Sequence, residues 1–364
     1  MAGSLKVASS AHETVRAELR ELVRGMNSYY SNQIEGQSTH PSNIERALKL
    51  DFSDKPEVAR LQRIALAHIE AEKELESRAA AGAMPLLSSF AIEAHRAMYG
   101  RLSEADRTTA ENVIVEPGAM RGTDVEVGRH VPPTWQTIPR FLARLDAVYG
   151  RVPGSDDLLI KAACAHQRLA WVHPFVDGNG RVARLQTHCA LLPINAGLWS
   201  ANRGLARRRD EYYARLAEAD ESRRGDLDGR GNLSEEGLRR WVAFFLELCR
   251  DQVTFMAGLF ELQGMKRRIE ALIVFRSSQD RAYRSEAILP LFHLFAAGPL
   301  TRAEFQQMTG LGERVARKLL SNLLKSGLVK TDTPLGAVRF ALPLDGLQFL
   351  LPDLYPEAAG RGDS

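Results

Sequence analysis

Apolar residues recur every three or four positions along most of the chain, and this spacing places them on one face of an α-helix. The first stretch of this kind covers residues 12–34, with an apolar face of leucine, valine and methionine and with Gly36 as a stop signal. A second stretch, residues 56–80, has a face rich in Glu, Lys and Arg opposite its apolar face. Further helical stretches cover residues 86–100, 137–150, 156–171, 181–196, 207–218 and 234–275. The pattern predicts an all-α body.

One passage before residue 285 departs from helical spacing. Residues 122–133 alternate valines with polar residues around a Gly-Arg turn and end in two prolines. Such alternation around a glycine-containing turn predicts a small β-hairpin. Because a lone two-stranded hairpin is barely stable in water, we expect this one to have a specific role on the helical body.

The pattern changes from about residue 285 onward. A helical stretch at 286–297 is followed by the capping box Thr301-x-x-Glu304, which opens a short helix, and by a longer helix at 313–326. Two strand-like segments then flank a Pro-Leu-Gly turn at 334–336. The order helix, turn, helix, hairpin predicts a C-terminal winged helix-turn-helix domain.

The longer helix of this domain has a basic face that is separate from its apolar face. Basic side chains on a second helix suit contacts with nucleic acid, but winged helices also bind proteins, and few of these side chains suit base recognition. Nucleic-acid binding and protein docking therefore both stay open. The polar residues of this face are Arg314, Arg317, Lys318, Asn322 and Lys325.

Composition adds limits to this picture. The chain has 364 residues, which predicts two or three domains, and its net charge of +3 is too small to indicate a nucleic-acid partner by itself. The three cysteines match no zinc-site spacing, so buried thiols in a reducing compartment are expected. The first residues lack the apolar run of a signal peptide, and no apolar run approaches the ~18 residues of a membrane span. We expect a cytoplasmic protein with no membrane partner.

The segment HPFVDGNGRVAR, residues 173–184, contains the candidate chemistry. It lies between two apolar helical stretches, so it forms a loop that leads into a helix N-terminus, where free N–H groups attract phosphate. Gly178 and Gly180 let the backbone approach an anion closely. Arg181 and Arg184 share one helical face and can both point toward one polyphosphate. The alternative is an ordinary Gly-Asn-Gly turn without chemistry.

Two further side chains in this segment complete a catalytic set. The carboxylate of Asp177 is a hard oxygen ligand that suits a Mg²⁺ ion bridging phosphates. The imidazole of His173 can take a proton from an attacking hydroxyl at neutral pH. The segment therefore predicts transfer of a phosphate-containing group.

These residues match the signature H-x-F-x-[D/E]-G-N-G-R-x-x-R of the Fic (filamentation induced by cAMP) family at every position, and the order of elements over residues 20–250 is similar as well. The resemblance implies an all-α Fic fold with a small β-hairpin flap. It implies a protein adenylyltransferase that uses ATP and Mg²⁺ to move AMP onto a Ser, Thr or Tyr hydroxyl of a target protein or of itself. The implied site is His173 as base, Asp177 for Mg²⁺, Gly178, Asn179 and Gly180 as anion hole, and Arg181 and Arg184 for the β- and γ-phosphates.

The segment SNQIEG, residues 31–36, resembles the inhibitory pattern [S/T]-x-x-x-E-[G/N] of the same family. Ser31 and Glu35 lie four residues apart, on one face of a helix that ends at Gly36. If this helix packs on the core, Glu35 can form a bidentate pair with Arg184 and occupy the place of the γ-phosphate. The alternative is a surface glutamate at the end of an amphipathic helix.

The resemblance also assigns roles outside these two segments. It implies that Val125, Glu126, Val127 and Gly128 belong to a flap that pins an extended target segment by strand addition, although an ordinary hairpin over a core edge is an equal alternative. Tyr212 and Tyr213 resemble the region that lines the adenine pocket, although aromatic pairs of this kind are more often core residues.

The expected organisation has five parts: a helical region with the inhibitory helix (1–84), the Fic core (85–260), a connecting helix (261–284), the winged helix (285–345) and a tail (346–364). Two other functions stay open: removal of AMP by the same site, or a DNA-binding regulator that senses ATP. The target protein, the nucleotide base and homodimer formation are not predicted by the sequence.

Overall fold

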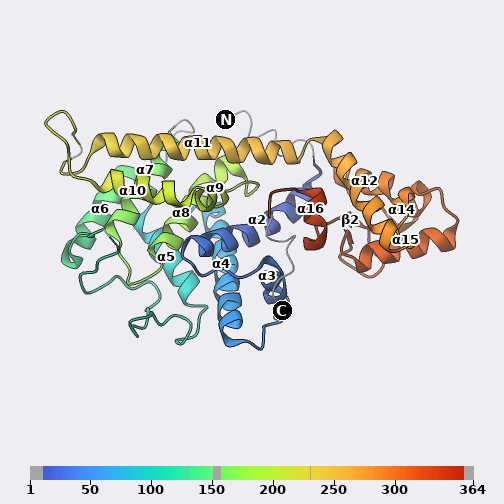
Figure 1. Cartoon of the computed structure of the whole chain (residues 1–364), viewed down its shortest axis with the longest axis horizontal. Coiled ribbons are helices and arrows are strands. Elements are labelled where there is room, and N and C mark those ends of the chain that lie inside the picture. Colours follow the sequence, from blue (N-terminus) through green and yellow to red (C-terminus); the bar gives the residue numbers. More distant parts are fainter. Residues whose placement is uncertain (1–10, 129, 151–156, 230, 356–364) are drawn as a thin grey trace.

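The computed structural model describes residues 11–128, 130–150, 157–229 and 231–355. A helical body and a smaller C-terminal module lie at opposite ends of an elongated molecule, and one long helix, α11, runs along the body toward the module (Figure 1). The prediction of a mainly helical fold is confirmed. Within the described ranges, no helix combines the length and the apolar character needed to cross a membrane.

The helices of the body follow the predicted stretches closely. Their bounds are α2 Glu13–Ile34, α3 Pro41–Leu48, α4 Pro56–Ala80, α5 Ser88–Tyr99, α6 Ile138–Tyr149, α7 Leu158–Val172, α8 Asn179–Asn195, α9 Ala201–Arg207, α10 Arg209–Asp220 and α11 Glu235–Leu259, with a 3-10 turn at Trp135–Thr137.

Two of the predicted helices are divided. The stretch at 207–218 becomes the end of α9 and the whole of α10, because the chain leaves helical geometry at Arg208 (φ −115°). The stretch at 234–275 is broken after α11, and the carboxylate of Glu261 then accepts hydrogen bonds from the backbone N–H groups of Gln263 and Gly264 to start α12, Leu262–Gln279. The spacing of apolar residues alone does not reveal these two helix breaks.

Helix α8 lies at the centre of the body. It packs against α4, α5 and α7, and most of its side chains are buried, including both of its arginines. It begins at Asn179, two residues earlier than predicted, because Gly178 in the left-handed region (φ +82°) turns the chain directly into the helix. The first turn of α8 thus belongs to the loop that precedes it and not to the helix body alone.

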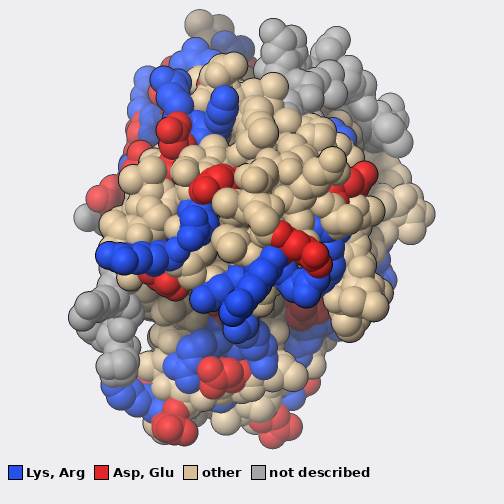
Figure 2. Space-filling model, turned by 90° about the vertical axis from the view of Figure 1, so that its right-hand side faces the viewer, with Lys and Arg blue, Asp and Glu red and all other residues tan. Residues whose placement is uncertain are grey.

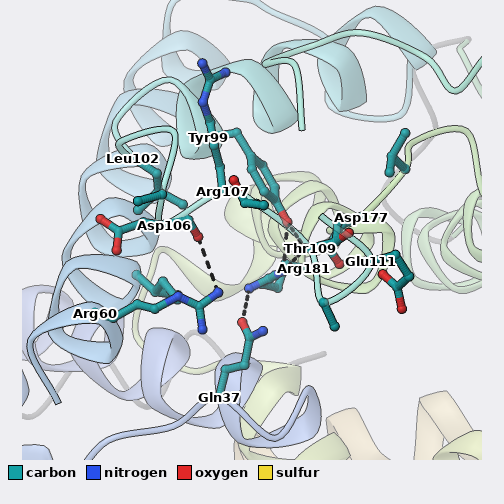
Figure 3. Close-up of a pocket in the computed structure, with 15 residues that line it drawn as sticks. Gln37, Arg60, Tyr99, Leu102, Asp106, Arg107, Thr109, Glu111, Asp177 and Arg181 are labelled. Atoms are coloured by element: carbon teal, nitrogen blue, oxygen red, sulfur yellow. Dashed lines mark hydrogen bonds and ion pairs between the residues drawn. The ribbon is translucent and has the colours of Figure 1, made fainter. Parts of the chain in front are cut away.

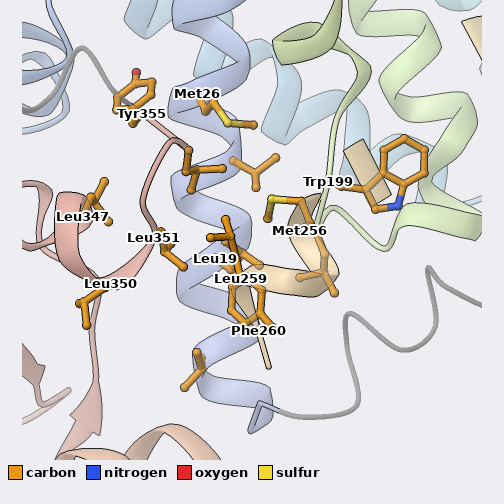
Figure 4. Close-up of a cluster of buried hydrophobic side chains, with 14 of the residues drawn as sticks. Leu19, Met26, Trp199, Met256, Leu259, Phe260, Leu347, Leu350, Leu351 and Tyr355 are labelled. Carbon is orange, nitrogen blue, oxygen red and sulfur yellow. The ribbon is translucent and has the colours of Figure 1, made fainter. Parts of the chain in front are cut away.

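Helix α2 joins the body to the C-terminal module. A buried apolar cluster packs its Leu19 and Met26 against the end of α11 and against the last described segment of the chain, with Tyr355 beside the helix (Figure 4). The side chains of Leu354 and Tyr355 are buried. The apolar residues of the described part of the tail thus cover α2.

The C-terminal module contains the predicted elements in the predicted order, and the capping box between Thr301 and Glu304 is present. Its two strands pair antiparallel, with Val329 opposite Phe340, and Leu300 forms a further bridge with Val338. Its assignment as a winged helix stays a prediction. The bounds are a 3-10 turn Ser285–Ala287, α13 Ile288–Ala296, α14 Arg302–Met308, α15 Glu313–Lys325, β1 Val329–Lys330, β2 Arg339–Phe340, a 3-10 turn Leu344–Gly346 and α16 Leu347–Leu350.

The basic face of α15 is open to solvent. Arg314, Arg317, Lys318 and Lys325 are exposed, while Leu319, Leu320 and Leu323 of the same helix are buried. Lys and Arg side chains are prominent on this end of the molecule (Figure 2). Glutamates and aspartates lie among them, and Arg317 pairs with Glu313, so the face is not uniformly positive.

Candidate active site

The loop between α7 and α8 has a residue with left-handed backbone geometry at each end. His173 ends α7 in the left-handed region (φ +50°), which is uncommon for a residue with a side chain, and Gly178 begins α8 in the same region. Between them, the side chain of Asn179 accepts a hydrogen bond from the N–H of Phe175 and donates one to its carbonyl, both at 2.9 Å. The loop therefore wraps around the first turn of α8.

The side chain of Asn179 is part of the loop structure. Its amide accepts one hydrogen bond from the backbone of Phe175 and donates one to it, so the side chain shapes the loop, and its role in an anion hole stays a prediction. What remains for an anion is the backbone at the start of α8, where the first N–H groups have no partner within the helix.

A buried histidine supports this loop from below. The ring of His95, on α5, stacks on Phe175 at 4.1 Å, and its Nδ1 accepts a hydrogen bond from the N–H of Gly118. Its Nε2 therefore carries the proton and donates to the carbonyl of Asp177 at 3.2 Å. Burial lowers the pKa of His95 to about 4, so the ring is neutral. No motif pointed to this residue, which looks like any histidine on a helix.

Asp177 and Arg181 form a compact polar group with Tyr99, another residue that the sequence did not indicate (Figure 3). The Nη2 of Arg181 lies 2.8 Å from Asp177 Oδ2 and 2.7 Å from the Tyr99 hydroxyl, which donates to the same carboxylate oxygen. The Nη1 of Arg181 donates to Gln37 just beyond α2. A Cβ on Gly178 would lie 2.5 Å from the Tyr99 ring, so only glycine fits there.

The carboxylate of Asp177 is suited to a hard cation. Burial would raise its pKa, but the charge of Arg181 and the hydrogen bond from Tyr99 outweigh burial and hold the pKa below its ordinary value. Its side chain is 45% exposed, and its inner oxygen receives both hydrogen bonds. The outer oxygen can therefore serve a Mg²⁺ ion that also contacts phosphate. The prediction that Asp177 binds Mg²⁺ fits this geometry.

A cavity of about 550 Å³ opens beside this group (Figure 3). It reaches the loop through Val176, Asp177 and Arg181, whereas His173 and Glu35 are not part of its lining. Its other walls are α4 and the segment after α5, which contribute Arg60 and Arg107. The cavity thus approaches the catalytic loop from the side opposite the histidine.

The imidazole of His173 is neutral, as a general base must be. Burial lowers the pKa of its imidazole to about 4, and the nearby His130 ring, 6.2 Å away, lowers it further. A hydrogen bond to the backbone of Ala170 orients the ring. The buried side chain of Arg121 donates to the carbonyl of His173 at 2.8 Å and so holds the unusual backbone geometry. At neutral pH the imidazole is uncharged and can accept a proton.

The side chain of Arg184 on α8 contacts the end of α2. Its guanidinium is 1% exposed, and its Nη2 lies 2.5 Å from Glu35 Oε1. The same guanidinium donates from Nε to the Ser31 hydroxyl at 2.9 Å and from Nη2 to the Ser31 carbonyl at 3.0 Å. The predicted pair is present, but it is not bidentate, because Ser31 takes the second donor of the fork.

The carboxylate of Glu35 lies directly over the anion-binding turn. A Cβ on Gly180 would collide with Glu35 Oε1, so the second loop glycine is required by this carboxylate. Burial would raise the pKa of Glu35, but the charges of Arg184 and Arg181 hold it below its ordinary value. A negative charge therefore lies at the helix N-terminus, in the place where phosphate would bind.

Tyr212 and Tyr213, the predicted adenine-pocket pair, contact other side chains and backbone groups of the protein. Tyr212 is 2% exposed and its hydroxyl lies 2.9 Å from Nε2 of His166, and a nucleotide contact by Tyr212 stays a prediction. The hydroxyl of Tyr213 donates to the carbonyl of Ile34, as does the guanidinium of Arg209. These two residues of α10 thus bind the C-terminal end of α2, and a nucleotide contact by Tyr213 stays a prediction.

The predicted hairpin is reduced to one bridge between Val127 and His130, closed by Gly128 in the left-handed region. Arg129 lies outside the described residues. Arg121 donates hydrogen bonds to the carbonyls of Thr123 and Pro133 on either side of this bridge. Val127 is 44% exposed, so the segment presents an apolar side chain to solvent.

Comparison with known proteins agrees with this geometry. The family model described as Fic/DOC family matches residues 85–191, which include the whole loop and the start of α8. Residues 85–191 therefore resemble a Fic domain. Helices α2–α4 and everything after α8 lie outside the matched range.

Curated relatives resemble the Fic domain and its flanks at modest identity. A protein adenylyltransferase Fic from Nematostella vectensis is 30% identical over 166 residues, which cover 45% of this chain and 36% of that protein. A protein adenylyltransferase fic-1 from Caenorhabditis briggsae is 32% identical over 144 residues, covering 35% of this chain and 26% of that one. The match thus spans about a third or less of the length of these relatives.

Solved structures share the fold. A Fic family protein from Desulfovibrio desulfuricans aligns over 88% of this chain and 87% of its own, with a TM-score of 0.50 and 17% identity. A Fic domain containing signaling protein from Bacteroides thetaiotaomicron aligns over 71% of this chain and 92% of its own, with a TM-score of 0.53 and 17% identity. The Fic domain and its surrounding helices therefore form a known arrangement.

The clamp by Asn179 yields a stability prediction. Replacement by alanine leaves the N–H and the carbonyl of Phe175 buried without partners, so Asn179→Ala should lower the free energy of unfolding by about 1–3 kcal/mol. Urea unfolding followed by circular dichroism measures the change. The exposed Asn232 offers a control, and Asn232→Ala should match the wild type. An Asn179→Ala protein as stable as the wild type would contradict the proposed clamp.

Proposed function

We propose that this protein is an adenylyltransferase that moves AMP from ATP onto a hydroxyl group of a protein, and that α2 restrains the reaction. The observation that carries the proposal is a neutral histidine beside a helix N-terminus that also presents two buried arginines and a partly exposed carboxylate. The curated relatives support it, since they are named protein adenylyltransferases.

In this mechanism, the phosphates of ATP bind at the first turn of α8. The N–H groups at the start of the helix and the positive end of its dipole attract them. Arg181 and Arg184 then neutralise negative charge that develops during transfer. Asp177 would hold Mg²⁺, which supplies charge neutralisation on the phosphates when bound.

His173 acts on the attacking group. Its neutral imidazole takes the proton of the target hydroxyl, whose oxygen forms a bond to the α-phosphorus while the bond to the departing pyrophosphate breaks. The flap around Val127 is proposed to hold the target segment as an added strand, because Val127 is 44% exposed. The modified residue of the target protein is proposed to be a Ser, Thr or Tyr.

The restraint by α2 follows from the position of Glu35. Its carboxylate lies at the anion-binding turn and is paired with Arg184. A phosphate that binds Arg184 must therefore displace this carboxylate, and until then the two negative charges repel each other. Charge-assisted hydrogen bonds of this kind contribute about 1.5–3 kcal/mol. Productive binding of ATP requires this contact to break.

The first prediction concerns the base. His173→Ala should lower AMP transfer by about 10²–10⁴-fold, because a positioned general base contributes that much. ATP affinity should change little, since the phosphate contacts lie on α8. Incorporation of label from α-³²P-ATP, together with ATP titration calorimetry, tests both parts. A variant that transfers AMP at the wild-type rate would exclude His173 as the base.

The pH dependence of the reaction provides a second test. Because burial lowers the pKa of His173 to about 4, the imidazole stays neutral, and therefore active as a base, well below its ordinary titration range. The transfer rate at saturating ATP should thus change little from about pH 8 to about pH 5.5 and fall only at lower pH. A half-maximal rate near pH 6.5, the ordinary histidine value, would contradict the buried environment of the base.

The third prediction concerns the restraint. Glu35→Gly should raise AMP transfer or auto-modification by roughly 10- to 150-fold, the equivalent of losing about 1.5–3 kcal/mol. Intact-mass spectrometry after incubation with ATP and Mg²⁺ detects the added AMP. Glu104→Gly is a matched control, because that glutamate is 75% exposed in a turn. Equal rates for wild type and Glu35→Gly would refute the restraint, and no AMP on any variant or target would refute the transferase proposal.

A further inference from the structure

A second group of metal-ligating side chains lies between α2, α4 and α8, outside the catalytic loop. Glu72 and Glu76 on α4 and His188 on α8 place their ligand atoms within 4.8 Å of one another. His188 Nε2 is 2.8 Å from Glu76 Oε1 and 3.4 Å from Glu72 Oε1. His68 lies one turn before Glu72 on the same face of α4, so three ligand-type residues follow at intervals of four.

These side chains are deeply buried and not fully paired. His68 and Glu72 are 0% exposed, and His188 is 1% exposed at its side chain. Within the described residues, neither ring nitrogen of His68 has a hydrogen-bond partner, and Oε2 of Glu72 has none either. His68 Nδ1 and Glu72 Oε2 face each other at 3.9 Å, which is too long for a hydrogen bond. Buried polar atoms without partners are costly, so this gap requires an occupant.

The spacing of the atoms suits a metal ion. Histidine and carboxylate ligands bind Zn²⁺ at about 2.0–2.2 Å, which separates neighbouring ligand atoms by about 3.0–3.5 Å. The distances of 2.8 and 3.4 Å from His188 Nε2 to the two glutamates lie close to that range, and Glu72 Oε2, which has no partner, faces His68 at 3.9 Å. Two carboxylates and one imidazole therefore give a three-ligand set that suits Zn²⁺ or a related transition metal, with His68 next to it.

We propose that Glu72, Glu76 and His188, with His68 beside them, form a buried site for a divalent transition-metal ion of the Zn²⁺ class. The site is separate from Asp177, which lies on the catalytic loop, and the proposal does not depend on the adenylyltransferase reaction.

Residues of α2 support these ligands from outside the cluster. Asn27 donates from Nδ2 to Glu72 Oε1 at 2.7 Å. Arg24 donates to Glu76 Oε2 from Nε at 2.8 Å and from Nη2 at 2.6 Å, which leaves Oε1 directed at His188. Outer hydrogen bonds of this kind fix the orientation of metal ligands. A bound ion would therefore also strengthen the attachment of α2 to α4 and α8.

The rival explanation is a metal-free cluster, in which His188 shares a proton with the glutamates and a buried water fills the gap beside His68. The two explanations predict different metal contents for the folded chain. A metal site gives the folded chain a fixed amount of metal, whereas the proton cluster gives none.

The test uses the full-length protein, first stripped with a chelator and then equilibrated with Zn²⁺ and desalted. Native mass spectrometry should show one Zn²⁺ per chain, and thermal unfolding should occur at a higher temperature than in the stripped protein. Loading with Co²⁺ in place of Zn²⁺ should give visible absorption bands typical of a site with nitrogen and oxygen ligands. A wild-type protein that retains no Zn²⁺ and shows no Co²⁺ bands would overturn the proposal.

Variants locate the ion. Glu72→Gln and His188→Gln keep side-chain size and should each lose the bound Zn²⁺ and the Co²⁺ bands. Glu74→Gln, on the same helix but outside the cluster, should retain one Zn²⁺ per chain. Retention of Zn²⁺ by both cluster variants would show that the ion binds elsewhere and would overturn the assignment. If a cluster variant does not fold, the metal content of the wild type still decides.

Discussion

The contact of Arg184 with Glu35 and Ser31 is the interaction on which the rest of the structure depends. It joins the first helix of the body to the helix that forms the anion-binding turn, and it does so through a guanidinium that is almost fully buried. A buried arginine needs a partner, because an unpaired charge in the protein interior is strongly destabilising. In the closed arrangement the partner is Glu35; in the proposed active arrangement it would be phosphate. The same guanidinium thus links stability with catalysis.

Helix α2 is held from three sides. Arg209 and Tyr213 of α10 bind its C-terminal end, the polar cluster with Glu72 and His188 lies along its middle, and the C-terminal module contacts its N-terminal half. In the last contact, Glu18 forms ion pairs with Lys330 and Arg339, and the hydroxyl of Tyr355 donates to the carbonyl of Gly25. Glu35 therefore lies at the end of a helix whose position is fixed by the body and by the module together.

The helical fold and the catalytic loop could be predicted from the sequence because their signals are local: apolar spacing gives the helices, and the loop residues are adjacent in the chain. The pairing of Glu35 with Arg184 was predicted from two motifs, but the bidentate geometry was not correct, since Ser31 competes for the fork. His95 and Tyr99 were missed because their role appears only when α5 packs under the loop. The burial of Tyr212 was not predicted because nothing local distinguishes a core tyrosine from one that faces a ligand.

In the proposed restraint, Glu35 occupies the place of a terminal phosphate of ATP. The most direct measurement compares the affinities of the His173→Ala protein for ATP and ADP with those of the Glu35→Gly, His173→Ala double variant, so that no turnover interferes. If Glu35 blocks the terminal phosphate, removing it should strengthen ATP binding much more than ADP binding. An unchanged ratio of the two affinities would contradict the account.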